Sequence, residues 1–163
     1  MDLLKKYASV LNINISDGQL NSFRLYSEQL IKWNAKFNIT RITSPEEIQI
    51  KHFLDSITLL KLIPNPIPVP MSLIDIGSGG GFPGIPLKIM IPQIDVTLLE
   101  ATGKKCDFLS HISKTLGLEK IQIVKDRAES LSHNNQFRNQ FDLVTSRALA
   151  STATLVELSA GFC

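Results

Sequence analysis

Residues 75–86, DIGSGGGFPGIP, constrain the fold of this chain more than any other stretch. They begin with an acid and hold five glycines and two prolines. The buried-strand pattern SLIDI (72–76) leads into them, and the helical pattern GIPLKIMI (84–91) follows. A glycine-rich turn between a strand and a helix lies at the carboxyl edge of a parallel sheet, where such folds bind ligands. The turn therefore predicts both a fold class and the place of a ligand site.

The chain beyond this turn repeats the alternation of strand and helix. Three further short apolar segments predict strands: DVTLLE (95–100), IQIVK (121–125) and FDLVTS (141–146). Two helical patterns lie among them, KKCDFLSHISKTLG (104–117), which Gly117 closes, and ALASTATLVELSAG (148–161); SLSHNNQFRNQ (130–140) is expected to be a polar loop. Strands that alternate with helices predict an α/β fold with a doubly wound parallel sheet.

The first 62 residues carry helical patterns instead. Ser16 is a plausible N-cap for the amphipathic stretch that follows it. The segment SPEE predicts a second start, with Ser44 as N-cap, Pro45 at the first helical position and Glu47 completing a capping box. His52 and Asp55 lie one helical turn apart in the helix that begins there, and they are expected to pair with each other.

A proline-rich stretch separates the two patterns. IPNPIPVP (63–70) holds four prolines, which remove backbone donors and cannot continue a helix. We therefore predict a boundary here, between an N-terminal helical region at residues 1–64 and a ligand-binding sheet domain at residues 65–163.

Composition excludes several classes of protein. Lys and Arg number 17 against 15 Asp and Glu, so the net charge of +2 neither indicates nor excludes a nucleic-acid partner. No apolar run approaches the roughly 18 residues that span a membrane, and the N-terminus lacks the order of a signal peptide. Cys106 and Cys163 form neither metal-binding spacing nor a disulfide framework. These features predict a cytoplasmic protein without a metal or a membrane partner.

The glycine turn can be aligned with two ligand motifs. GGGFPG (79–84) matches the GxGxxG pattern of dinucleotide sites, whereas DIGSGGG (75–81) matches the D/E-x-G-x-G-x-G pattern of S-adenosylmethionine sites. Glu100, at the end of the second strand, fits both, because a carboxylate can bind the ribose hydroxyls of either ligand. A turn without a ligand is the third alternative.

Asp75 favours the methyl donor, because a carboxylate beside the turn would repel a pyrophosphate and attract a sulfonium or an amine. Pro83 and Pro86 also remove N–H groups that would hold a phosphate. We therefore predict S-adenosylmethionine as the cofactor, with Asp75, Gly79 and Glu100 among its contacts.

The chain resembles the bacterial RsmG/GidB family, which methylates N7 of a guanine in the 16S rRNA of the small ribosomal subunit. The matching segments are KWNAKFNIT (32–40), KHFLDS (51–56), DIGSGGGFPGIPL (75–87), LLEATGKKCDFL (98–109), RAE (127–129) and SRALA (146–150). The resemblance implies a Rossmann-like class I S-adenosylmethionine-dependent methyltransferase with an N-terminal helical extension. It also implies that the partner is the small subunit or its rRNA and that the full-length protein is a monomer.

The resemblance further assigns residues to the site. It implies that Gly77 and Phe82 line the donor pocket and that Ala128 and Glu129 hold the adenine end. Arg147 would lie beside both the donor and the incoming base, as a donor contact and as the catalytic residue.

The last segments of the chain depart from the family pattern. The sequence stops after the helix that follows the fourth strand, so we expect an incomplete parallel sheet and a C-terminally truncated chain. Two alternatives to an active rRNA methyltransferase stay open at this point. One is a donor-binding fragment without activity, and the other is an NAD(P)-dependent oxidoreductase.

The residues after the fourth strand bear on the methyl acceptor. TSRA (145–148) offers neither the nucleophilic cysteine that methylation of a pyrimidine carbon needs nor the Asn/Asp-Pro-Pro-aromatic motif typical of exocyclic amine methylation. Guanine N7 needs neither, since its lone pair lies in the ring plane and is unprotonated at neutral pH. The sequence is therefore consistent with N7 as the acceptor and with catalysis by alignment.

Overall fold

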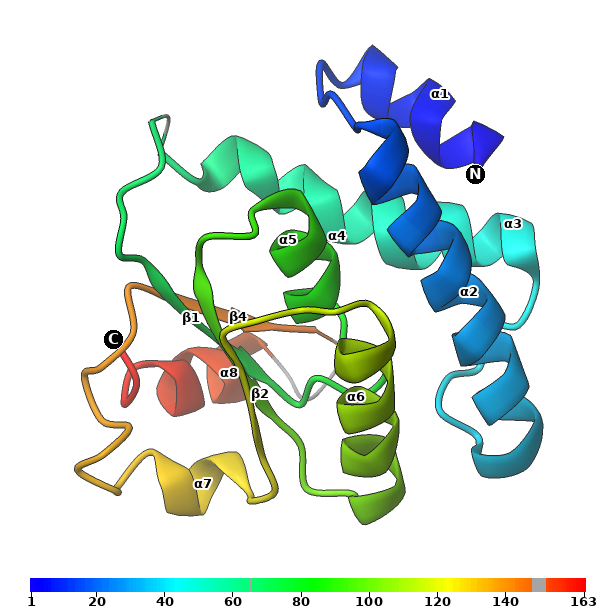
Figure 1. The fold of residues 1–163 in the computed structure, drawn as a ribbon. Helices are drawn as coiled ribbons and strands as arrows, with labels where there is room; N and C mark the ends of the chain where they lie inside the picture. Colours follow the sequence, from blue (N-terminus) through cyan, green and yellow to red (C-terminus); the bar gives the residue numbers. More distant parts are fainter. Residues whose placement is uncertain (65, 148–151) are drawn as a thin grey trace.

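Four parallel strands form the centre of the molecule. The computed structural model describes residues 1–64, 66–147 and 152–163. The strands lie in the order β3-β2-β1-β4 and comprise β1 (Ser72–Ile76), β2 (Asp95–Leu99), β3 (Ile121–Val124) and β4 (Leu143–Ser146) (Figure 1). The prediction of a parallel sheet is therefore confirmed. Since the chain passes from β3 back to the far side of β1, the strand order reverses between β1 and β4, where doubly wound folds bind ligands.

Helices cover both faces of this sheet. α5 (Gly84–Met90) and α6 (Gly103–Thr115) pack on one face, and α7 (Ala128–Leu131) and α8 (Thr152–Ser159) on the other (Figure 1). The sheet supplies alternate side chains to the two cores, Leu73 and Leu98 to one and Ile74 and Leu99 to the other. This alternation follows from the pleat of the strands.

The structure agrees with most, but not all, of the features predicted around the sheet. Gly117 adopts a positive φ of 62° directly after the C-cap of α6, as expected. The prediction of an irregular loop over 130–140 is wrong at its start, because α7 covers the first two of these residues. The last helix is confirmed from Thr152 to Ser159, whereas residues 148–151 of that prediction lie outside the described residues.

The N-terminal region begins with α1 (Asp2–Val10) and α2 (Asp17–Phe37). A continuous helical segment follows, composed of α3 (Pro45–Glu47), the π-helix η1 (Ile48–Leu54), α4 (Asp55–Thr58) and the 3₁₀ turn η2 (Leu59–Leu62). Ser16 caps α2 in a full capping box with Gln19. Ser44 caps α3 as predicted, but the Glu47 carboxylate binds Lys51 rather than completing the box.

One hydrophobic core joins this region to the sheet. Phe23 and Tyr26 of α2 and Phe53 of η1 are fully buried and belong to the same cluster as Phe82 and Phe108. The Gln19 side chain also donates to the carbonyls at the end of α5. The division at residue 64 stays a prediction, while the packing shows that the helical region forms part of the wall around the sheet's carboxyl edge. In the part of the chain that is described, no helix is both long and apolar enough to cross a membrane.

Candidate functional site

The glycine turn is fixed by hydrogen bonds to the neighbouring strand. The backbone N–H groups of Gly77 and Ser78 both donate to the Leu99 carbonyl at the end of β2, over 2.8 and 3.0 Å. Gly77 and Gly79 have φ values of 69° and 58°, a left-handed conformation that residues with a Cβ adopt rarely. The sequence needs glycine here because the turn must reverse tightly while its backbone stays against β2.

Asp75 anchors the far end of the turn. Its buried carboxylate accepts hydrogen bonds from the Gly84 N–H, at 3.0 Å, and from the Thr145 hydroxyl, at 3.3 Å. Burial raises the pKa of Asp75 to about 6, against the opposing effect of these hydrogen bonds. A Cβ on Gly84 would lie 2.6 Å from the Leu98 side chain and 3.0 Å from this carboxylate, so only glycine fits. Contrary to the expectation from the sequence, Asp75 lies behind the turn and does not line the cavity.

Glu100 is the first residue after β2 and faces the turn. Its side chain is buried and accepts from the Gly79 N–H at 2.9 Å and from the Thr102 N–H at 2.8 Å. Each carboxylate oxygen therefore has one bond to the backbone, and the group is held in a single orientation. Each oxygen keeps a second lone pair, because a carboxylate accepts about four hydrogen bonds.

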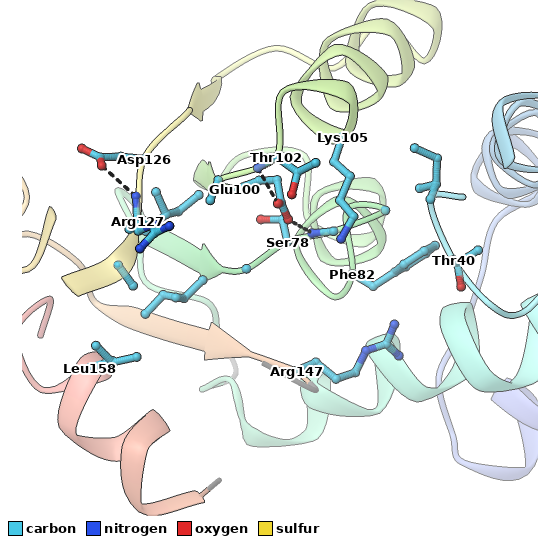
Figure 2. Close-up of a pocket in the computed structure, with 18 of the residues that line it drawn as sticks. Thr40, Ser78, Phe82, Glu100, Thr102, Lys105, Asp126, Arg127, Arg147 and Leu158 are labelled. Atoms are coloured by element: carbon cyan, nitrogen blue, oxygen red, sulfur yellow. Dashed lines mark hydrogen bonds between the residues drawn. The ribbon is translucent and has the colours of Figure 1, made fainter. Parts of the chain in front are cut away.

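A cavity of about 570 Å³ opens at this edge of the sheet. It is lined by seven of the eight residues predicted from the sequence: Gly77, Gly79, Phe82, Glu100, Ala128, Glu129 and Arg147. Figure 2 shows Arg147, Phe82 and Thr40 at one end and Asp126, Arg127 and Leu158 at the other, with Glu100 and the turn between them. The packing of the helical region against the sheet thus brings together residues more than 100 positions apart in the sequence, such as Thr40 and Arg147.

The end near α7 combines acids with apolar side chains. Asp126 and Glu129 line it, together with the apolar groups of Ile76, Leu99 and Leu158. The Asp126 carboxylate accepts from the Arg127 N–H at 2.7 Å. Apolar walls suit the faces of a purine, and carboxylates suit hydroxyl and amino groups, so this end can hold a nucleoside.

The opposite end is built around Arg147, which follows β4. One terminal nitrogen of its guanidinium donates to the Asp55 carboxylate at 2.8 Å and to the Lys51 carbonyl at 2.9 Å, and the other lies 2.9 Å from His52 Nδ1. The expected pair between His52 and Asp55 is wrong, because both side chains bind Arg147 instead. The His52 ring stacks on Phe82, with centroids 4.2 Å apart.

Sequence reasoning left several residues of this cavity unassigned, among them Thr40 and His52. Both come from the helical region, inside the family-matching segments 32–40 and 51–56. Lys105 also lines the cavity, while its neighbour Lys104 lies over the Phe37 ring. Among the described residues, no group of His, Cys, Asp and Glu has an arrangement suited to a metal ion.

Comparison with known proteins indicates one family of methyltransferases. A family model described as "GidB: rRNA small subunit methyltransferase G" matches residues 19–162. A ribosomal RNA small subunit methyltransferase G from Dehalococcoides mccartyi is 46% identical over 95% of this chain and 65% of its own length. Its counterpart from Roseiflexus castenholzii is 44% identical over 100% of this chain and 68% of its length. The chain spans less than two thirds of the length of the first of these relatives.

Solved structures share the fold at low sequence identity. A S-adenosylmethionine-dependent methyltransferase from Aquifex aeolicus superposes with a TM-score of 0.54 at 16% identity, over 77% of this chain and 65% of that one. A putative protein-L-isoaspartate O-methyltransferase from Plasmodium falciparum, in complex with S-adenosyl-L-homocysteine, gives 0.54 at 19%, over 96% and 78%. The fold is thus that of class I methyltransferases, and nothing found here supports the oxidoreductase alternative.

Proposed function

This chain belongs to the rRNA small subunit methyltransferase G family, and we propose that it binds S-adenosylmethionine and transfers the methyl group to N7 of a guanine in 16S rRNA. One observation carries the proposal. The cavity joins a backbone-fixed glycine turn and Glu100 to a guanidinium at its other end.

The size and lining of the cavity fit the methyl donor. Its volume of about 570 Å³ falls within the range typical of small-molecule sites. In the proposed complex the free lone pairs of Glu100 accept hydrogen bonds from ribose hydroxyls. Ala128 and Glu129 lie beside the adenine, while Gly77 and Phe82 contact the remainder of the donor.

The first turn of α5 explains why a dinucleotide fits less well. The Gly84 N–H is bonded to the Asp75 carboxylate, and the Ile85 N–H is bonded to the Gly81 carbonyl. Pro86 has no N–H, and the Leu87 N–H is bonded to the Pro83 carbonyl. The helix therefore offers no free donors to a pyrophosphate, although helix N-termini commonly bind one. Asp75 serves the site by fixing this turn rather than by contacting the ligand.

The proposed chemistry is an attack by the lone pair of guanine N7. When bound, the donor supplies an electrophilic methyl group on a positively charged sulfur. The protein needs no general base, because N7 carries no proton at neutral pH. Its residues orient the two reactants, and Arg147 contacts the acceptor and holds it in line, so the rate gain comes from proximity and orientation. We expect the full-length protein to act on the small subunit as a monomer in the bacterial cytoplasm, without a metal.

Two measurements test this function. Calorimetry should detect binding of S-adenosylmethionine but not of NAD. With tritiated donor, 30S subunits or free 16S rRNA should become labelled at guanine N7, at a rate nearly constant between about pH 7 and 8.5. NAD binding alone, or a methyl group at another atom, would refute the proposal. Donor binding without transfer would leave the chain as a donor-binding unit.

A further inference from the structure

We call the end of the cavity that holds Arg147, Phe82 and Thr40 the acceptor end. Arg147 follows β4 of the sheet, whereas the hydrogen-bond partners of its guanidinium come from the N-terminal helical region. Its guanidinium binds Asp55, the Lys51 carbonyl and His52, and lies 5.3 Å from the centre of the Phe82 ring. These partners occupy the π-helix η1 and the residue after it, and π-helical stretches are frequent at functional sites. The position of Arg147 therefore depends on a segment outside the sheet.

The hydrogen bonds of His52 determine its protonation. A guanidinium can only donate, so His52 Nδ1 must accept from Arg147 at 2.9 Å. The proton of a neutral ring then lies on Nε2, which donates to the Thr40 hydroxyl oxygen at 2.9 Å. That oxygen also accepts from the Ile42 N–H at 3.1 Å. The chain thus fixes one tautomer of His52 from both sides.

The surroundings of His52 support the neutral form. Its side chain is buried, its ring is parallel to Phe82 within 5°, and Arg147 is the cation in contact with it. Burial and the Arg147 charge lower the pKa of His52 to about 4, whereas the Asp55 charge opposes this. At neutral pH the ring is therefore an uncharged acceptor facing Arg147.

Asp55 is the weaker of the two side-chain partners. Its side chain is 56% exposed, and ion pairs at such exposed positions contribute little, because water screens them. His52 is buried and can hold the guanidinium in one orientation.

We propose that His52 is a positioning residue that holds the Arg147 guanidinium at the acceptor end of the cavity through its unprotonated Nδ1, with Thr40 fixing the tautomer. This inference rests on the proposed function, because the acceptor end is where the guanine would enter. It places part of the transfer machinery in the helical region rather than in the donor-binding sheet.

Two substitutions separate positioning from packing. His52→Phe keeps an aromatic ring on Phe82 but removes both hydrogen bonds, whereas His52→Asn places an acceptor oxygen near the position of Nδ1. We expect His52→Phe to lower turnover with 30S subunits about 30-fold and His52→Asn about fivefold, with donor affinity changed less than about threefold in both. His111→Phe is the matched control, since His111 is a half-buried, hydrogen-bonded histidine that lies outside the cavity.

A double-mutant cycle then tests whether His52 acts through Arg147. In an Arg147→Ala background, His52→Phe should lower turnover by less than about twofold further. Full turnover in His52→Phe, equal losses in the Phe and Asn variants, or an undiminished loss in the Arg147→Ala background would overturn the inference.

The inference also has a readout that does not need activity. Nitrogen NMR at pH 7 should show Nδ1 of His52 unprotonated and Nε2 protonated, and the Nδ1 signal should shift in Arg147→Ala. A protonated Nδ1, or a signal that does not respond to Arg147, would overturn the inference. If the parent chain transfers no methyl group while this signature is present, the proposed function fails and the contact stands.

Discussion

The two ends of the cavity, which we propose to hold the methyl donor and the acceptor, are built in different ways. At the donor end, most of the hydrogen bonds that fix the site involve backbone groups. The turn bonds to Leu99, Glu100 bonds to Gly79 and Thr102, and all of these lie within 26 residues of the chain. At the acceptor end, side chains from separate segments meet, with His52 from η1 and Arg147 from the end of β4.

This difference has a physical consequence. Backbone hydrogen bonds in a buried turn have few alternatives, so the donor end is expected to keep its shape without a ligand. The acceptor end depends on long side chains, and Arg147 is 28% exposed there. A long side chain loses more conformational freedom when it is held in one rotamer, so its orientation depends on its partners. Substitutions should therefore affect donor binding and transfer separately.

The largest expected effect is on transfer. Arg147→Ala removes the guanidinium from the acceptor end but leaves the turn and Glu100 unchanged. We expect turnover with 30S subunits to fall at least about 100-fold and donor affinity to change less than about fivefold. Single-turnover kinetics and calorimetry would measure the two quantities.

Arg24→Ala is the matched control, because Arg24 is exposed on α2 and lies outside the cavity. Equal losses of transfer and donor affinity in Arg147→Ala would remove the distinction between the two ends.

The next effect is on donor binding. Glu100→Ala removes a charged acceptor and leaves the Gly79 and Thr102 N–H groups without their partner. We expect donor affinity to fall about 10- to 100-fold, since hydrogen bonds to charged groups contribute about 1.5–3 kcal/mol. Calorimetry would measure it, with Glu119→Ala, an exposed acid outside the cavity, as the control. Unchanged affinity in Glu100→Ala would show that the carboxylate does not contact the donor.

Titratable groups near the two ends of the cavity should make the free energy of unfolding depend on pH in opposite directions. The pKa of Asp75 is raised to about 6 in the folded state, so the native protein binds its proton more tightly and stability falls as pH rises from about 4 to 6. The pKa of His52 is lowered to about 4, so stability rises as pH rises from about 4 to 6.5. The two contributions oppose each other in nearly the same range.

Single variants should uncover each contribution. Asp75→Asn should leave a stability that rises with pH, and His52→Asn should leave one that falls, each by about 1–3 kcal/mol across the range. Urea unfolding at pH 4, 5, 6 and 7 would measure both slopes. Slopes that match the parent in both variants would contradict this assignment.

The smallest effect concerns the contact between α2 and the turn. The buried Tyr26 hydroxyl donates to the Gly80 carbonyl. Tyr26→Phe removes this bond and keeps the ring, so we expect a loss of stability of about 1–2 kcal/mol and a donor affinity lower by about two- to fivefold. Thermal unfolding and calorimetry would measure both, with the exposed Tyr7→Phe as the control. A larger effect on transfer than on donor affinity would place Tyr26 with the acceptor end.

The residues that line the proposed donor end could be brought together from the sequence because they are close together in the chain. Glycines between a strand and a helix, followed by an acid after the next strand, carry both the topology and the ligand class. Asp75 is the instructive error. Its charge was interpreted as a ligand contact, whereas the need to bond the Gly84 N–H places it behind the turn.

The acceptor end could not be predicted from residues alone. Arg147 was named through the family resemblance, and His52 was paired with its helical neighbour because local spacing is the only distance that a sequence shows. Its true partner lies 95 positions away. Thr40 lies in a segment that resembles the family, but nothing local indicated its contact with His52.

The strand order also implies a time order during synthesis. β1, β2 and β3 leave the ribosome in succession and are neighbours in the sheet, whereas β4 joins on the opposite side of β1. Once about 130 residues have emerged, the nascent chain therefore contains every residue that the sequence assigned to donor binding except Arg147. Because chains fold progressively as they are made, the growing polypeptide is expected to pass through a form that can hold the proposed donor before it can engage the proposed RNA acceptor. Stalled ribosome complexes of increasing length would reveal that form.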